Sequence, residues 1–515
     1  MKKLKYVLLL VCALFLILPL RGAVSTPRIN IEGIPNYFLS VYAGYEHTCG
    51  ITLRDSTMCW GRNDYGQLGI GGTDDSPSPI RINSLKYLSA AGSGGENHTC
   101  AITFDGDAYC WGDNVDGQLG SGDNESSDIP VLVSGGMEWA QISAGILTTC
   151  GVTTSGAAYC WGSNSGGQIG AGYFGDPYPN VPTAVSGLGE GTVQSISVGE
   201  YYACALTTGG GVKCWGKNDY GQLGIGNYED QHTPVDVTGL TSGVVSIATG
   251  SYHTCALTSG GGVKCWGNNY DGQLGDGKAE NYSNVPVDVT GLSSGVETIA
   301  AGGYHSCALT TEGAAKCWGY NSQGQLGDNS NTMRTTPVNV FGLNEGVSGI
   351  STGYAHTCAV VEQEYGDGIK CWGSNYHGEL GTGDYDNSWV PVDVISDVGI
   401  IKGEVHVMGG PTGPIGVAAF LSLSDTEPFS DEYPLTSGDS YELWYIEQDE
   451  YYVLAYLDVD GSGEDIDWDE PYAWYDSDGD GNPDPVSVPV GEGVDGINLS
   501  ILGAWFEIFL PLVLR

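Results

Sequence analysis

The sequence predicts an all-β protein made of a seven-bladed β-propeller followed by a small β-sandwich. The main observation is a Cys…Cys-Trp-Gly unit that recurs seven times, with its tryptophans at Trp60, Trp111, Trp161, Trp215, Trp266, Trp318 and Trp372. Successive tryptophans lie 51, 50, 54, 51, 52 and 54 residues apart, a period long enough for one four-stranded blade. The composition agrees, because 82 glycines, 31 tyrosines and only 16% charged residues favour strands and tight turns over helices.

The first 23 residues are predicted to be a signal peptide (residues 1–23). A basic start is followed by an apolar run from Tyr6 to Leu20, which is shorter than the roughly 20 residues of a membrane-spanning helix. Arg21 blurs the cleavage site, so a retained N-terminal anchor is the alternative. We therefore expect a secreted or cell-surface protein, with no transmembrane span in the mature chain.

The charge balance is strongly acidic. Lys and Arg total 18 against 62 Asp and Glu, a formal net charge of −44. Such a surface repels phosphate backbones and anionic lipid. Nucleic acid is therefore excluded as an expected partner.

The cysteines predict disulfides. Cys12 lies in the apolar leader, and an even count of fourteen in the rest of an exported chain favours bridges. The alternatives are reduced cysteines buried in the core and zinc ligands, although the spacing lacks the usual zinc pattern. The predicted pairs are Cys49 with Cys59, Cys100 with Cys110, Cys150 with Cys160, Cys204 with Cys214, Cys255 with Cys265, Cys307 with Cys317, and Cys358 with Cys371.

The fifth copy shows how one bridge forms. A hairpin centred on Gly260 sets Cys255 opposite Cys265 on one face and places Trp266 on the other face. Directly opposed residues on paired strands are close enough for a disulfide. The seventh copy has three additional residues between its cysteines, within residues 362–368, and we expect them to lie in the turn rather than in the paired strands.

Two further signatures complete each repeat. One is a Gly-Gln-Leu-Gly segment, found at residues 66–69, 117–120, 167–170, 221–224, 272–275, 324–327 and 378–381 with Ile169 and Glu379 as its variants. Its glycines supply turn conformations and its Leu or Ile is expected to fill the space between blades. The other is a Pro-led strand, and a spare copy at Thr26–Ile31 is predicted to pair with the last blade and close the ring.

The combined pattern HTCALT…CWG-x-N-x-x-GQLG…P-V-x-V resembles the regulator of chromosome condensation repeat family, over roughly residues 26–394. The resemblance implies a seven-bladed propeller, which we assign to residues 24–396. Members of that family include nuclear guanine nucleotide exchange factors, secreted bacterial inhibitors of β-lactamase and interaction modules. The acidic balance and the predicted export argue against nucleotide exchange.

Five histidines stand two residues before the first cysteine of a pair: His47, His98, His253, His305 and His356, with Thr148 and Tyr202 in the other two copies. A metal or proton site is one interpretation, but one histidine per blade favours a structural hydrogen bond repeated around the ring. No copy contains a serine elbow, a distinctive acid pair or a phosphate loop. We therefore expect no enzymatic activity.

Loops that differ between copies are the candidate binding surface. They cover residues 71–77, 122–127, 172–179, 227–232 and 383–389, and they carry aromatic and acidic side chains. Such side chains on a rigid scaffold suit recognition of a protein or a carbohydrate. The alternative is ordinary solvated loops.

The repeat stops near Val394, and residues 397–500 show alternating apolar runs such as Tyr451–Leu457, typical of a β-sandwich. This region resembles the prealbumin-like, carboxypeptidase-regulatory type of accessory domain. Its acidic turns suit Ca²⁺, and the candidate ligands are Asp458, Asp460, Asp476, Asp478, Asp480 and Asp484. Simple acidic turns are the alternative, because Ser487 stands where an EF-hand requires Glu. Residues 501–515 form an apolar tail.

Taken together, these features predict a monomeric, non-catalytic extracellular scaffold that binds an unidentified protein or carbohydrate, with Ca²⁺ as the one expected cofactor. The first alternative is an enzyme inhibitor of the β-lactamase-binding kind. The second is guanine nucleotide exchange, which only the family resemblance suggests.

Overall fold

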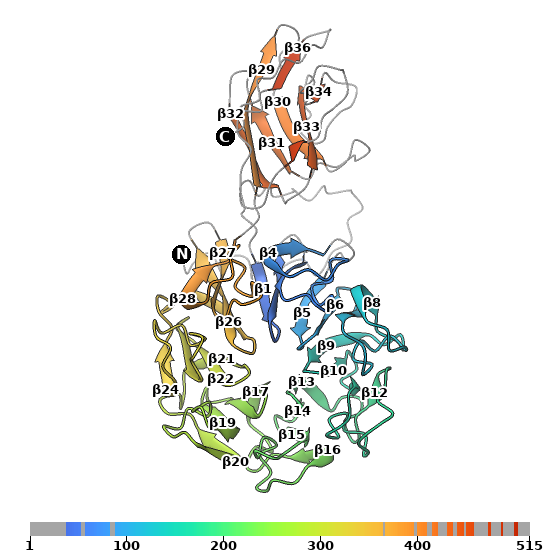
Figure 1. Ribbon diagram of the computed structural model, residues 1–515, viewed down its shortest axis with the longest axis vertical. Helices are drawn as coiled ribbons and strands as arrows, with labels where there is room; N and C mark the ends of the chain where they lie inside the picture. The colour runs from blue at the N-terminus through green and yellow to red at the C-terminus, as the bar shows by residue number, and fades with distance from the viewer. Residues whose placement is uncertain are drawn as a thin grey trace, which may run out of the picture. The chain divides into compact units, whose positions relative to one another are not determined.

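The computed structural model describes residues 38–52, 57–82, 88–363 and 366–395, together with the strands between residues 399 and 502. Seven consecutive four-stranded sheets form the propeller, and Figure 1 shows them arranged as a ring. All regular elements of the described residues are strands. The predicted all-β, seven-bladed propeller is therefore confirmed. No helix in this described part is long and apolar enough to cross a membrane.

The first four blades follow the chain in order. Blade 1 holds β1 (Phe38–Ala43), β2 (His47–Thr52), β3 (Thr57–Gly61) and β4 (Ser76–Arg81). Blade 2 holds β5 (Leu88–Gly94), β6 (His98–Thr103), β7 (Ala108–Gly112) and β8 (Ser127–Leu132). Blade 3 holds β9 (Trp139–Ala144), β10 (Thr148–Thr153), β11 (Ala158–Gly162) and β12 (Thr183–Ala184). Blade 4 holds β13 (Val193–Val198), β14 (Tyr202–Thr207), β15 (Val212–Gly216) and β16 (Gln231–Asp236).

The remaining three blades keep the same order. Blade 5 holds β17 (Val244–Thr249), β18 (His253–Thr258), β19 (Val263–Asn269) and β20 (Asn281–Asp288). Blade 6 holds β21 (Val296–Ala301), β22 (His305–Thr310), β23 (Ala315–Gly319) and β24 (Arg334–Asn339). Blade 7 holds β25 (Val347–Thr352), β26 (His356–Gln363), β27 (Gly366–Gly373) and β28 (Ser388–Asp393).

The central hairpin of each blade has the predicted register. In blade 5, Cys255 pairs with Cys265 and Thr254 pairs with Trp266. Side chains alternate between the faces of a sheet, so the cysteines and the tryptophan lie on opposite faces. The same direct pairing of the two cysteines is present in the other six blades.

All seven predicted disulfides are confirmed, one within the hairpin of each blade. The Cα atoms of each bonded pair lie 4.0 to 4.1 Å apart. Neither reduced cysteines nor zinc ligands therefore describe these positions. From blade 1 to blade 7, the bonds join Cys49 to Cys59, Cys100 to Cys110, Cys150 to Cys160, Cys204 to Cys214, Cys255 to Cys265, Cys307 to Cys317, and Cys358 to Cys371.

The two faces of a blade serve two different interfaces. The disulfide of blade 5 packs with Leu274 of its own Gly-Gln-Leu-Gly segment against Trp318 of blade 6. Equivalent clusters fill all seven junctions of the ring, and every tryptophan of the repeat is 0% exposed. The predicted role of the Leu or Ile as a plug between blades is confirmed.

The ring closes by direct packing of blade 7 on blade 1. Trp60 and Phe38 of blade 1 share a cluster with Leu380 of blade 7, and Trp60 Nε1 donates a 2.9 Å hydrogen bond to the Glu379 carbonyl. Each blade in the described residues takes its four strands from its own repeat. The spare strand at Thr26–Ile31 lies outside the described residues, as does the signal segment.

The hairpin of blade 7 differs from the prediction. Its pairing continues beyond Val361↔Gly368 to Glu362↔Asp367 and Gln363↔Gly366, so β26 and β27 each have eight residues where the blade 5 pair has six and seven. The expectation that the additional residues lie only in the turn is wrong. The inserted residues keep the antiparallel register and lengthen the paired strands.

The C-terminal region contains further strands: β29 (Gly399–Met408), β30 (Ile415–Phe420), β31 (Ser430–Leu435), β32 (Ser440–Ile446), β33 (Glu450–Leu457), β34 (Tyr472–Trp474), β35 (Val486–Ser487) and β36 (Leu499–Leu502). They pair as β32-β29-β36 and as β31-β30-β33-β34, with β35 beside β33. The β-sandwich remains a prediction. The candidate calcium ligands Asp458, Asp460, Asp476, Asp478, Asp480 and Asp484 lie outside the described residues.

Candidate functional site

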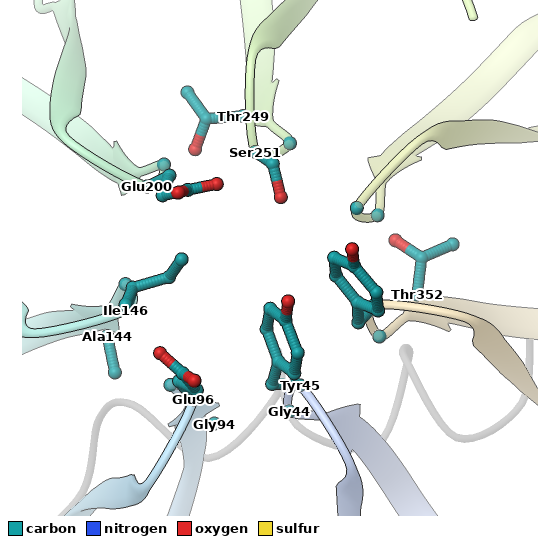
Figure 2. Close-up of a pocket in the computed structure, with 18 of the residues that line it drawn as sticks. Gly44, Tyr45, Gly94, Glu96, Ala144, Ile146, Glu200, Thr249, Ser251 and Thr352 are labelled. Carbon is teal, nitrogen blue, oxygen red and sulfur yellow. The ribbon is translucent and has the colours of Figure 1, made fainter. Parts of the chain in front are cut away.

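A cavity of about 100 Å³ opens at the mouth of the central channel. Three residues from each blade line it: the last residue of the first strand and the two that follow, which are Thr249, Gly250 and Ser251 in blade 5. Figure 2 shows these segments converging on the channel axis. We call this cavity the channel mouth, and the end of the propeller that carries it the channel face.

The middle residue of each lining triplet, which is the first residue after the strand, is glycine: Gly44, Gly95, Gly145, Gly199, Gly250, Gly302 and Gly353. A Cβ on Gly250 would lie 2.3 Å from the Gly302 carbonyl oxygen, and a Cβ on Gly302 would lie 2.4 Å from that of Gly353. Such distances are well inside van der Waals contact, so only glycine lets neighbouring blades approach this closely. The glycines therefore allow neighbouring blades to pack closely where they surround the channel.

The residue after each glycine differs from blade to blade. Around the ring this position holds Tyr45, Glu96, Ile146, Glu200, Ser251, Gly303 and Tyr354. In Figure 2, Tyr45, Glu96, Ile146 and Glu200 extend into the opening. The chemistry of the mouth therefore comes from one variable position, four residues before the first cysteine of each repeat.

One side of the mouth is aromatic. The Tyr45 and Tyr354 rings stack with centroids 4.0 Å apart, and Tyr304 meets Tyr354 edge-on at 5.5 Å. Tyr252 follows at 6.2 Å from Tyr304. The two longer separations lie in the range of favourable aromatic pairs and the shortest is a direct stack, so four tyrosines from blades 1, 7, 6 and 5 form a continuous wall.

The aromatic wall continues outward over blades 4 and 5. Tyr220 lies 5.1 Å from Tyr252 and 6.3 Å from Tyr282, and Tyr282 contacts Tyr228 and Tyr270. The last three rings are 42 to 49% exposed. We call the eight residues Tyr45, Tyr354, Tyr304, Tyr252, Tyr220, Tyr282, Tyr228 and Tyr270 the tyrosine track. It runs from the channel mouth to the rim.

The other side of the mouth is acidic. Burial raises the pKa of Glu200; a hydrogen bond from the Tyr252 hydroxyl opposes this, and the negative charge of Glu96 adds to it. Burial also raises the pKa of Glu96, against the pull of Arg62. Arg62 is itself held by Glu46 and Asp64 at 2.8 Å. Two partly desolvated carboxylates thus face the aromatic wall.

The five repeated histidines lie away from this chemistry, in the junctions between blades. His253 Nε2 is 2.8 Å from the Ser306 hydroxyl of the next blade, and that hydroxyl donates to the Gln273 carbonyl. The hydroxyl hydrogen is thereby used, so Nε2 carries the proton that the histidine donates. The same contact joins His47 to Thr99, His98 to Thr149, His305 to Thr357 and His356 to Thr48.

Burial lowers the pKa of these histidines, to about 4 for His47 and about 3 for the other four. They are neutral hydrogen-bond donors with a structural role. The sequence analysis favoured this role over a metal or proton site. Within the described residues no group of three or more His, Cys, Asp or Glu side chains is placed to hold a metal ion. In blade 4, the Tyr202 hydroxyl donates instead to the His253 carbonyl.

A buried asparagine fixes the variable loops on the channel face. Asn218 accepts from the Leu223 amide at 3.0 Å and donates to the Asn227 carbonyl at 3.0 Å. The carbonyl nine residues downstream is bound in the same way by Asn63, Asn114, Asn164, Asn269, Asn321 and Asn375. The predicted recognition loops therefore start from fixed anchors.

These loops expose large apolar side chains. Phe174 is 61% exposed, Tyr385 52% and Trp389 45%. The sequence indicated these loops but missed the channel mouth. The signal in the sequence was the variable residue four positions before the first cysteine of each repeat. It could not be interpreted as a site without the ring, which brings Tyr45 and Tyr354 together.

Seven blades, each with an internal disulfide, a buried Trp and a Gly-Gln-Leu-Gly-type segment, define a propeller of the chromosome-condensation-regulator class. The chain belongs to the Regulator of chromosome condensation (RCC1) repeat family, whose model matches residues 59–102, 105–152, 155–206, 210–257, 261–309 and 312–360. Each match starts in or near the hairpin of one blade and ends in the second strand of the next. Seven blades therefore contain six such windows.

Two curated relatives illustrate the range of the family. The chain is 30% identical to the ultraviolet-B receptor UVR8 of Arabidopsis thaliana, over 80% of this chain and 94% of that protein. It is 32% identical to the human E3 ubiquitin-protein ligase HERC2 over 62% of this chain, but that match covers only 7% of HERC2. The ligase name thus describes a far longer protein.

Solved structures share the fold. Human WBSCR16 matches with a TM-score of 0.60 and 25% identity, covering 67% of this chain and 96% of that one. Prp20p of Saccharomyces cerevisiae matches with a TM-score of 0.58 and 21% identity, covering 70% of this chain and 87% of that one. At 21% identity, the match to Prp20p shows only that the fold is shared.

Proposed function

We propose that this protein is a non-catalytic, extracellular interaction module that binds a protein partner through its channel face. The observation that carries the proposal is the tyrosine track, a continuous line of rings from the channel mouth to exposed positions on blades 4 and 5. Tyrosine supplies large contact area at little entropic cost and is enriched in protein interfaces. The glycine ring and the anchored loops hold this surface rigid, which lowers the cost of binding.

A protein partner is ranked ahead of a carbohydrate because the tyrosine track extends over several blades, an extent that suits a protein surface; what propellers of the same fold bind is consistent with this. The solved structure of Prp20p was described together with its binding to Gsp1p and histones, and yeast RCC1 was solved bound to Kap60. A carbohydrate stacked on Tyr228, Tyr270 and Tyr282 is the second candidate, because exposed rings side by side also suit sugar faces.

Action outside the cell is supported by the seven disulfides, since such bonds persist in oxidising compartments. The predicted signal peptide agrees with export, and the net charge of −44 argues against nucleic acid as a partner. The absence of catalysis is proposed because the five repeated histidines are 0% exposed and committed to contacts between blades.

The experiment is a capture from the extracellular fraction of the native host with the full chain as bait and mass spectrometry as readout. The variant Tyr228→Ser/Tyr270→Ser/Tyr282→Ser should lose the captured partner. The matched control is Phe104→Ser/Phe341→Ser, which removes rings that are 63% and 59% exposed at the opposite end of their blades. Equal capture by both variants would contradict the proposed face.

The two alternatives have their own readouts. Inhibition of a β-lactamase by the wild-type chain, lost in the tyrosine variant, would identify the partner as that enzyme. Accelerated nucleotide release from a small GTPase would instead support exchange and overturn the extracellular interpretation. Retention of a glycan rather than a protein by the wild-type bait would favour the carbohydrate candidate.

A further inference from the structure

We infer that the channel mouth is a single-cation subsite that receives the charged end of one lysine or arginine side chain from the protein partner. This inference rests on the proposed function, because it places one anchor of the partner at the inner end of the tyrosine track. The observations are a cavity, an aromatic wall and two inward carboxylates that come from separate blades.

The acidic side offers negative charge that the protein leaves unpaired. The Glu96 carboxylate is half-buried and makes no hydrogen bond or ion pair with any described residue, and Glu200 is held only by neutral donors, the Tyr252 hydroxyl and Ser251. None of the lining residues carries a positive charge. Arg62, the cation that acts on Glu96, is already neutralised by Glu46 and Asp64. A bound cation would offset the cost of desolvating both carboxylates.

The aromatic side favours an organic cation. The stacked rings of Tyr45 and Tyr354 border the same opening as the carboxylates; Figure 2 shows Glu96 beside Tyr45 and Glu200 across the opening from it. The faces of aromatic rings attract ammonium and guanidinium groups, most strongly where water is excluded. Among the described residues no three His, Cys, Asp or Glu side chains are placed together to hold a metal ion, and an aromatic wall beside carboxylates suits an organic cation better than a metal.

The size of the mouth limits the occupant to one head group. The cavity measures about 100 Å³, which is room for one side-chain head group rather than for a peptide segment. A side chain that enters from the channel face would therefore place its charge between the carboxylates and its aliphatic stem against the tyrosines.

The test is saturation-transfer difference NMR on the full chain with n-butylammonium and ethylguanidinium as probes and n-butanol as the neutral isostere. Both cations should give saturable signals that n-butanol lacks. The variant Glu96→Gln/Glu200→Gln should bind the cations at least about tenfold more weakly. The matched control Glu297→Gln/Glu312→Gln removes two exposed charges and should bind as the wild type does.

The aromatic wall is tested separately with Tyr354→Leu, which keeps an apolar side chain without a π face. Its cation affinity should fall about threefold to tenfold with a melting temperature close to that of the wild type. Equal binding of n-butanol, an equal loss in the control variant, or unchanged affinity in Glu96→Gln/Glu200→Gln would each overturn the subsite.

The partner capture separates failure of this inference from failure of the proposed function. If the tyrosine variant loses the partner while Glu96→Gln/Glu200→Gln keeps it, the interaction face stands and the subsite is wrong. If the cations bind as expected while the tyrosine variant keeps the partner, the subsite stands as a cation site and the proposed face is wrong.

Discussion

The junctions between blades and the channel mouth are built from neighbouring residues of the same repeat, but they vary in opposite ways. At the junctions, Cys, Trp, Gln and Leu or Ile return in nearly every copy and make the same contacts seven times. Four residues before the first cysteine, the mouth carries Tyr, Glu, Ile, Ser or Gly. Repetition therefore marks the residues that hold the ring together, whereas variation inside the repeat marks the residues that the ring presents to a partner.

Acid should have the largest effect, and the loss of stability should come from the five histidines at the junctions. The folded pKa of the five histidines lies below the unfolded value of about 6.5, so the unfolded chain binds more protons and stability falls as pH drops from about 6.5 towards 3. At pH 5 each histidine should cost about 2 kcal/mol. Glu96 and Glu200 act in the opposite sense, because their pKa values are raised. Urea unfolding at pH 7 and at pH 5 measures the net change in the free energy of unfolding.

A histidine variant provides the control for this pH dependence. His305→Gln keeps a side-chain donor towards Thr357 and should remove about one proton from the pH slope of the unfolding free energy. An unchanged slope would show that other groups drive the acid sensitivity.

Truncation of one repeated tryptophan should come next in size. Trp266→Ala removes a fully buried side chain and the 2.9 Å hydrogen bond to the Gln222 carbonyl, so we expect a loss of about 3–5 kcal/mol. The measurement is the unfolding free energy in guanidinium chloride. A loss below about 1 kcal/mol, close to the cost of an exposed change, would contradict the account of the junctions.

Removal of one disulfide should be milder. Cys255→Ala/Cys265→Ala opens a loop with a sequence separation of 10 residues and should cost roughly 2–3 kcal/mol on the chain-entropy view. Calorimetry of this variant against the same change at Cys358 and Cys371 in blade 7, where the separation is 13 residues, should give similar losses. A much larger loss in one blade would show that the seven junctions are not equivalent.

The register of each hairpin and the faces of its side chains could be predicted from the sequence, because strand pairing and side-chain alternation depend on local residues. Cys255 and Trp266 could be assigned to opposite faces from one repeat alone. Tyr45 and Tyr354 could not be brought together in this way, since their contact depends on ring closure between the first and last blades. The extended hairpin of blade 7 was missed for a related reason. The sequence of residues 362–368 does not distinguish longer paired strands from a longer turn, so the pairing of Glu362 with Asp367 could not be predicted.

The comparison of junction and mouth is tested most directly by measuring unfolding free energy and n-butylammonium affinity on the same two variants. Glu96→Gln/Glu200→Gln should keep wild-type stability to within about 0.5 kcal/mol and lose cation binding. Trp215→Phe, at the junction of blades 3 and 4, should lose stability and keep cation binding once folded. The opposite pattern, with the glutamate variant unstable and still binding the cation, would contradict the account.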